Sequence, residues 1–246
     1  MSEGLAVLRI EQAEFQTPIR EFYNPYTGST IHAVGMTHIA EQDYFDTIAE
    51  FALDQENRGA AVHYEGVRPV TPEQRAADPR GTKEAEHFGK HLSAIHRATA
   101  RHSGLVFQKD AMQPPETWEN PDIDLVTLVK SLGSTVAQTL LQQSPKKRIA
   151  NTLPCRQKSA RAEFNAQMRN LAETDIVAVL GDTGKTLLEA RNSVQRSAIE
   201  TELLQIPDRD FVVLWGAAHL IGMSTDAHNL GYKQSGVRWL NAFSVE

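Results

Sequence analysis

Residues 211–222 read FVVLWGAAHLIG, an apolar run that ends in Gly-x-x-His and continues into a second apolar stretch. The same pattern occurs near the N-terminus, where residues 30–38 read TIHAVGMTH. Each copy predicts a strand, a tight turn at Gly35 or Gly216, and a helix that begins near His38 or His219. Ligand sites in open α/β sheets lie beyond the carboxyl ends of the strands, so the two histidines would converge if the two strands are neighbours. The alternative is that each histidine is an ordinary polar loop residue, but the recurrence of the pattern favours a site.

The segment before residue 67 predicts a hairpin followed by a strand–helix–strand unit. Ile19–Tyr23 and Ser29–Gly35 are rich in β-formers and flank the turn-forming stretch Asn-Pro-Tyr-Thr-Gly. Apolar residues at helical spacing predict a helix over Glu41–Asn57, and Gly59–Val67 returns as a strand. A βαβ unit is therefore expected.

The remaining chain adds a mostly helical middle segment, from about residue 82 to 172, and a C-terminal strand–helix–strand. The further elements expected are strands at Leu5–Ile10 and Asp175–Leu180, helices at Ile123–Leu141, Ser159–Leu171, Thr186–Gln205 and Ala218–Leu230, and a last strand within Tyr232–Phe243. The run at Asp175–Leu180 is short enough that it could instead extend a helix. We expect one α/β domain over residues 1–246, with a central mixed β-sheet flanked by helices.

Composition limits the classes of partner. The net charge is −6 and the pI is about 5.9, which argues against nucleic acid because duplex binding depends on a basic surface. No apolar run approaches the length of a membrane span, and the N-terminus lacks the pattern of a signal peptide. Cys155 is the single cysteine. These features lead us to expect a cytoplasmic protein without a membrane span; they leave the oligomeric state open.

A carboxylate accompanies the two histidines. Glu65 lies near the end of the strand predicted at Gly59–Val67, and His63, two residues earlier, shares its face of that strand. Two imidazoles and a carboxylate form a common shell for a catalytic divalent ion such as Mn, Co or Zn. We therefore expect His38, Glu65 and His219 to hold the metal. A second division of roles leaves Glu65 outside the shell as the general base.

Arg191 is the third indication of a site. On a helical wheel of Thr186–Gln205 it falls on the apolar face, beside Leu187 and Val194. A guanidinium directed at a core needs an anionic partner or a functional cavity. The alternative is an arginine that extends along the rim of the core to reach water. In the first case Arg191 would stabilise an oxyanion or hold a substrate carboxylate.

In this order, the motifs resemble those of the TraB/PrgY/GumN and Tiki proteins. The matching residues are Gly35-Met36-Thr37-His38, Val62-His63-Tyr64-Glu65, Arg191-Asn192, Gly216-Ala217-Ala218-His219-Leu220-Ile221-Gly222 and Leu230-Gly231-Tyr232. The resemblance extends from about residue 31 to 234. The first motif departs from the family's usual Gly-Thr-x-His, and Gly-Val-Arg68 follows Glu65 where members usually have Leu or Cys.

The resemblance implies a fold related to the erythromycin-esterase and ChaN-like group, and a metallopeptidase-like hydrolase acting on a peptide or small molecule. It maps the family's site onto His38, Glu65, Arg191 and His219, and we add His63, Arg68 and Asn192 as candidate substrate-binding residues. Two other functions stay open. One is a metal-free, esterase-like hydrolase, and the other is a non-enzymatic binder of peptide or haem.

Overall fold

A six-stranded mixed sheet forms the centre of the fold. The computed structural model describes residues 6–142, 154–174 and 176–245. The strand order is β1-β2-β3-β7-β5, and β8 pairs with β2 along its length. The bounds are β1 Arg9–Glu11, β2 Glu14–Tyr23, β3 Thr30–Met36, β5 Ala61–Tyr64, β7 Phe211–Gly216 and β8 Lys233–Ser244. The strands around β2 are antiparallel, whereas β3, β7 and β5 are parallel. The predicted α/β class and the predicted hairpin are confirmed.

The predicted βαβ unit is present, with a strand inserted into it. Helix α1 (Gln42–Asn57) connects β3 to β5, but β7 lies between these two strands and pairs with both. The residues of β7 from Phe211 to Trp215 are all buried, as a central strand covered on both faces requires. The carboxyl ends of three parallel strands therefore meet at one edge of the sheet.

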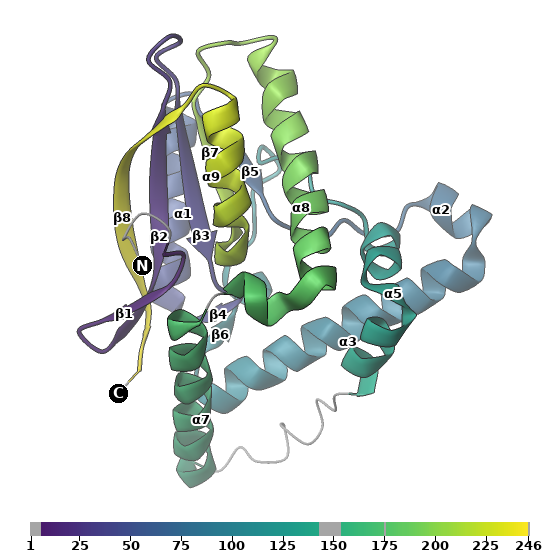
Figure 1. The fold of residues 1–246 in the computed structure, drawn as a ribbon. Coiled ribbons are helices and arrows are strands. Elements are labelled where there is room, and N and C mark those ends of the chain that lie inside the picture. The colour runs from purple at the N-terminus through teal and green to yellow at the C-terminus, as the bar shows by residue number, and fades with distance from the viewer. Residues whose placement is uncertain (1–5, 143–153, 175, 246) are drawn as a thin grey trace.

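Helices cover both faces of the sheet. In Figure 1, α1 lies behind the sheet, and α8 (Ile176–Leu203) and α9 (Leu220–Asn229) lie in front of it. Helix α9 follows β7 through the short 3-10 helix η1 (Ala217–His219) and packs on β3. Gly231, with a φ of 87°, follows the end of α9, as its position after the apolar run predicts.

The middle of the chain is mostly helical, as predicted. It contains α2 (Pro72–Ala77), α3 (Pro79–Ser103), α4 (Gln108–Ala111), α5 (Leu125–Gln142) and α7 (Pro154–Glu173), and a two-stranded pair formed by β4 (Ile39–Ala40) and β6 (Val106–Phe107). Figure 1 shows α2, α3 and α5 extending to one side of the sheet. Phe88, Ile123 and Leu128 form a second, smaller core there.

One predicted strand is wrong, and the strand predicted at Leu5–Ile10 is present as β1 but begins later, at Arg9. Residues 176–180 belong to α8, with a kink at Gly181, so the alternative of an extended helix is the one observed; Asp175 lies outside the described residues. A short apolar run has no periodicity that separates a strand from a helix. In Leu5–Ile10, Leu5 lies outside the described residues, and Val7 and Leu8 are buried without joining the sheet, because pairing with β2 begins at Arg9.

Among the helices of the described ranges, none combines the length and the apolar character needed to cross a membrane.

Candidate active site

The parallel pairing of β3 with β7 places the two Gly-x-x-His units side by side. Gly35 is in register with Trp215, and Met36 with Gly216. His219 then lies in η1 and is 3% exposed, whereas His38 follows the end of β3 and is exposed. The two strands are thus neighbours, which was the condition for the histidines to converge.

Glycine is required where the two units touch. A Cβ on Gly35 would lie 2.6 Å from Leu220 Cδ1 and 3.3 Å from Ala217 Cα, so a side chain would push the units apart. A Cβ on Gly222 would collide with the side-chain amide of Asn192. The glycines of these motifs therefore allow α9 and its partners to approach closely.

Glu65 lies one residue beyond β5 and points at the turn after β7. Its backbone N–H donates to the Leu214 carbonyl at 2.8 Å, and its carboxylate accepts from the Gly216 N–H and from Arg191 Nη2, the latter at 2.7 Å. Burial alone would raise the pKa of Glu65, but the charges of Arg191, His219 and His38 and the Gly216 N–H outweigh burial and lower the pKa to about 2. The carboxylate is therefore held ionised.

Arg191 is buried between two carboxylates. Its Nε donates to Asp122 Oδ1 at 2.9 Å and its Nη2 to Asp122 Oδ2 at 2.5 Å, while Nη2 also reaches Glu65. Its side chain is 10% exposed and that of Asp122 is fully buried. The prediction that Arg191 faces the core and needs an anionic partner is confirmed, and the arginine at the rim is excluded. With one guanidinium and two carboxylates, the cluster keeps one negative charge.

Asp122 is a site residue that the sequence analysis missed. It lies in the loop before α5, where an Asp is usually a helix cap. Asp124 takes that role, because its Oδ1 accepts from the Val126 and Thr127 N–H groups. Nothing in the sequence separates the two aspartates by role.

His219 has a fixed tautomer. Asn192 Nδ2 donates to the His219 carbonyl at 3.2 Å, so Asn192 Oδ1 is the atom that faces His219 Nδ1, at 2.6 Å. Nδ1 must then carry the proton, and Nε2 has the lone pair. Arg191 Nη1 lies 3.3 Å from this Nε2. Burial, reinforced by Arg191, lowers the pKa of His219 to about 4 against the opposing charge of Glu65, so the ring is neutral at pH 7.

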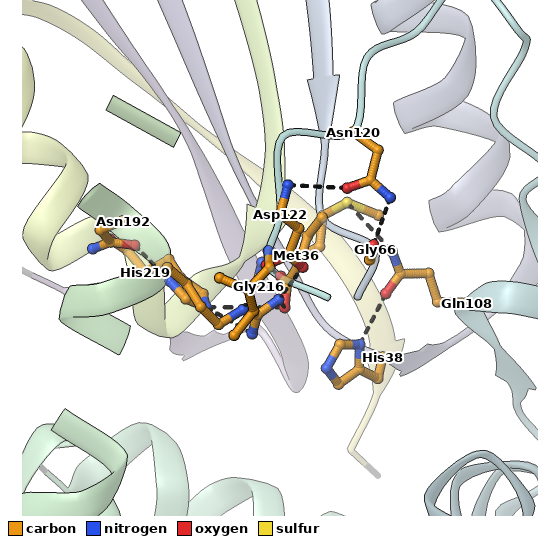
Figure 2. A network of polar contacts seen from close by, with 12 residues as sticks. Met36, His38, Gly66, Gln108, Asn120, Asp122, Asn192, Gly216 and His219 are labelled. Carbon is orange, nitrogen blue, oxygen red and sulfur yellow. Dashed lines mark hydrogen bonds and ion pairs between the residues drawn. The ribbon is translucent and has the colours of Figure 1, made fainter. Parts of the chain in front are cut away.

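His38 is held in a similar way at the exposed end of the site. Its Nδ1 lies 2.9 Å from Oε1 of Gln108, a residue of α4 whose amide nitrogen faces Met36 Sδ at 4.0 Å. The ring stacks on His96, with 5.2 Å between centroids. Figure 2 shows His219 beside Asn192 at one end of the polar network and His38 beside Gln108 at the other. Gln108 is a second contact that sequence motifs did not identify.

A cleft of about 790 Å³ borders the polar network of His38, Glu65 and Arg191. His38, Glu65 and Arg68, which follow the ends of β3 and β5, line it together with Arg191 of α8, and residues of α3 and α5 line it from the helical middle segment. That segment therefore forms the far wall of the cleft.

The candidate substrate-binding residues occupy three different positions. Arg68 is exposed and lines the cleft. Asn192 lies behind His219, where it orients the ring. His63 shares the face of Glu65, as predicted, but is completely buried against α8, where its Nε2 lies 2.5 Å from Glu202 Oε1.

The ligand atoms of His38, Glu65 and His219 are of types that suit a divalent ion. The three residues are not among the described groups whose ligand atoms all lie within 4.8 Å of one another. Glu65 Oε1 lies 3.9 Å from His219 Nε2. Across the described residues, the group whose ligand atoms all lie within 4.8 Å of one another is His63, Glu119 and Glu202, and not the predicted set. His38 is the exposed member of the predicted set.

Comparison with known proteins returns no relative. No family model, curated protein or solved structure matches this chain. The likeness to the TraB/PrgY/GumN and Tiki proteins thus rests on the motifs alone and stays a prediction.

Proposed function

We propose that this chain is a metal-dependent hydrolase that cleaves an amide or ester bond in an acidic peptide or small molecule. The observation that carries the proposal is the common state of the two histidines. Each presents Nδ1 to a side-chain amide oxygen, from Gln108 or Asn192, and keeps Nε2 as the atom with a lone pair. Metal-binding histidines have this arrangement, because a partner at the second nitrogen sets the tautomer and the orientation of the ring.

The charges of the site also fit a cation. The charge of Asp122 balances that of Arg191, so the negative charge of Glu65 is available to a cation. Glu65, His38 and His219 would together hold a Mn, Co or Zn ion. When bound, such an ion lowers the pKa of a water and polarises a carbonyl. The pKa of about 2 at Glu65 makes it a poor proton acceptor at neutral pH, so we assign it to the ligand set and not to the role of general base.

Arg191 supplies fixed positive charge to the reaction. Two bonds to Asp122 hold the guanidinium, and its Nη1 lies 3.3 Å from His219 Nε2, beside the residues that would hold the ion. A preorganised donor at that position stabilises the developing oxyanion without reorganisation. Its role in this proposal is to stabilise charge, and it transfers no proton.

The cleft favours an anionic substrate. Arg68, Lys90 and Lys109 line it, and within the ranges that the structure describes none of the three forms an ion pair. The lining carboxylates are already paired, Glu65 with Arg191 and Glu86 with Arg75. A substrate carboxylate would therefore meet an excess of positive charge.

The family assignment and the cellular location belong to the same proposal. We place the chain with the TraB/PrgY/GumN and Tiki proteins on the order of its motifs, and in the cytoplasm on its single cysteine.

The test combines metal content with turnover. Untagged protein incubated with Mn, Co or Zn should hold metal at the site and cleave acidic members of a peptide and ester library. The double variant His38→Ala/His219→Ala should lose that metal and the activity. The matched control is His228→Ala, an exposed histidine on α9 that does not line the cleft. Unchanged turnover in the double variant with retained fold would exclude the proposal.

A metal-free hydrolase is the second candidate, and one contact favours it. Arg191 already bridges Glu65 and His219 directly, so these residues are held together without an ion. Full activity after exhaustive chelation would select this mechanism. The same activity lost on chelation and restored by one metal would select the first.

A further inference from the structure

A second group of potential ligands lies on β5, away from the cleft. His63 is in the middle of this strand, Glu202 is near the end of α8, and Glu119 belongs to the segment that runs beside β5. That segment is bonded to the strand, since the Tyr64 N–H donates to the Glu119 carbonyl and the Glu119 N–H to the Val62 carbonyl, both at 2.9 Å. Three parts of the chain distant in sequence thus meet at one side chain.

The ligand atoms have spacings that a small ion could bring to ideal values. His63 Nε2 lies 2.5 Å from Glu202 Oε1 and 3.9 Å from Glu119 Oε2, and all three atoms lie within 4.8 Å of one another. Ligands about 2.0–2.1 Å from a tetrahedral zinc are about 3.3 Å apart, which falls between these two distances. Small side-chain shifts would therefore suffice.

A buried amide oxygen next to the group lacks a partner among the described residues. Gln195 is 2% exposed and its Nε2 lies 3.2 Å from His63 Nδ1, yet its Oε1 has no hydrogen-bond partner there. Glu202 Oε2 is buried and forms an ion pair with Arg209 Nη1 at 3.2 Å. If a metal took His63 Nε2, the ring proton would move to Nδ1, and a turned Gln195 amide would accept it through Oε1. Such a partner at the second nitrogen is what a metal-bound histidine requires.

We propose that His63, Glu119 and Glu202 form a second divalent-metal site, suited to zinc, that fastens residues 115–124 to the edge strand β5. The site shares no ligand with the proposed active site, and none of its residues lines the cleft. Glu119, with a side chain 64% exposed, gives the ion access from solvent. Residues 115–124 include Asp122, which bonds to Arg191. An ion at the second site would therefore help to fix the position of Arg191 in the proposed active site.

The test compares two glutamates of one segment. Glu119→Gln removes a ligand, and Glu116→Gln changes an exposed neighbour outside the group. Zinc titration followed by calorimetry should show one fewer bound zinc, or at least about tenfold weaker binding at one site, for Glu119→Gln than for Glu116→Gln. Far-UV circular dichroism without metal should be the same for both, because both side chains are exposed.

A variant that lacks the active-site histidines distinguishes zinc binding at the second site from zinc binding at the active site. In the variant His38→Ala/His219→Ala, the second site should still bind one zinc, and adding Glu119→Gln should abolish that binding. Equal zinc binding by Glu119→Gln and Glu116→Gln in both backgrounds would overturn the proposal. Cobalt substitution in the His38→Ala/His219→Ala background adds a spectroscopic criterion, since a tetrahedral cobalt band should be present with Glu116→Gln and absent with Glu119→Gln.

Discussion

Arg191 on α8 and Glu65 beyond β5 are joined by a 2.7 Å hydrogen bond between Nη2 and Oε1, across 126 residues of chain. Asp122 holds the same guanidinium from the loop before α5. The bond therefore connects the sheet, the long helix and the helical middle segment at one point. Since all three side chains are at most 10% exposed, each charge depends on its partners for compensation.

Replacing Arg191 with Ala should destabilise the protein severely. The change leaves the carboxylates of Glu65 and Asp122 buried without their cation, which costs about 3–5 kcal/mol in comparable buried pairs. Urea denaturation gives the free energy of unfolding. The control on the same helix is Arg196→Ala, whose side chain is 36% exposed and should cost at most about 1 kcal/mol. Equal losses for the two variants would contradict the assignment of Arg191 as the central cation.

The stability of the metal-free protein should depend on pH through His219. Burial lowers its folded-state pKa to about 4, from an ordinary value of 6.5. The unfolded chain binds the proton more readily between these values, so the folded state loses stability as the pH falls from about 6.5 to about 4. The full effect is about 3 kcal/mol. Denaturation at several pH values in EDTA measures it. Because burial also lowers the pKa of His96 to about 4, His219→Asn should reduce this part of the profile without abolishing it, whereas His228→Asn should retain it in full.

Replacing Gly222 with Ala should disturb His219 without touching it. The new methyl group collides with the Asn192 amide, which sets the proton of His219 on Nδ1. We expect a mixed tautomer in nitrogen-15 NMR of the imidazole and a loss of about tenfold or more in activity. Thr225→Ala, at an exposed position of the same helix, is the control. A single Nδ1–H tautomer in Gly222→Ala would show that Asn192 is not what sets it.

Replacing Gln108 with Leu should weaken metal binding at the cleft. The change removes the acceptor of His38 Nδ1, and loss of such an outer partner lowers metal affinity by about 10–100-fold. Titration with Mn, Co or Zn measures the dissociation constant. Gln113→Leu, an exposed residue just beyond α4, is the matched control. Wild-type affinity in both variants would show that Gln108 does not orient His38 for metal binding.

Periodicity and motif context predicted the elements that carry the site. The strand–Gly-x-x-His pattern located β3 and β7. The helical wheel placed Arg191 on the apolar face of its helix but left open whether it enters the core, where the structure has it. Both results depend on local features, namely apolar runs that end in a glycine turn and the helical spacing of apolar residues. The identity of a strand's neighbours is not local. Nothing in the sequence placed β7 between β3 and β5, because that pairing is decided by burial over the whole sheet.

The sequence analysis missed two residues of the candidate site, Asp122 and Gln108. Asp122 lies in a loop, and Gln108 contacts His38 through its side-chain amide. Asp122 looks like an ordinary helix cap in sequence, and Gln108 has no motif. Their roles depend on three-dimensional placement by α5 and by the β4–β6 pair. Residues 176–180 illustrate a different error, because a short apolar run rich in β-branched residues was predicted to be a strand although it belongs to α8.

The insertion of β7 between β3 and β5 sets a condition on synthesis. Until residues 211–216 have been synthesised, β3 and β5 have no strand between them, and the gap that β7 will fill is about 10 Å wide. His38 and Glu65 follow strands on opposite sides of that gap, so the candidate site cannot form before β7 is present. A product that stops before Phe211 should be a substrate for chaperones and proteases, and not a weak enzyme.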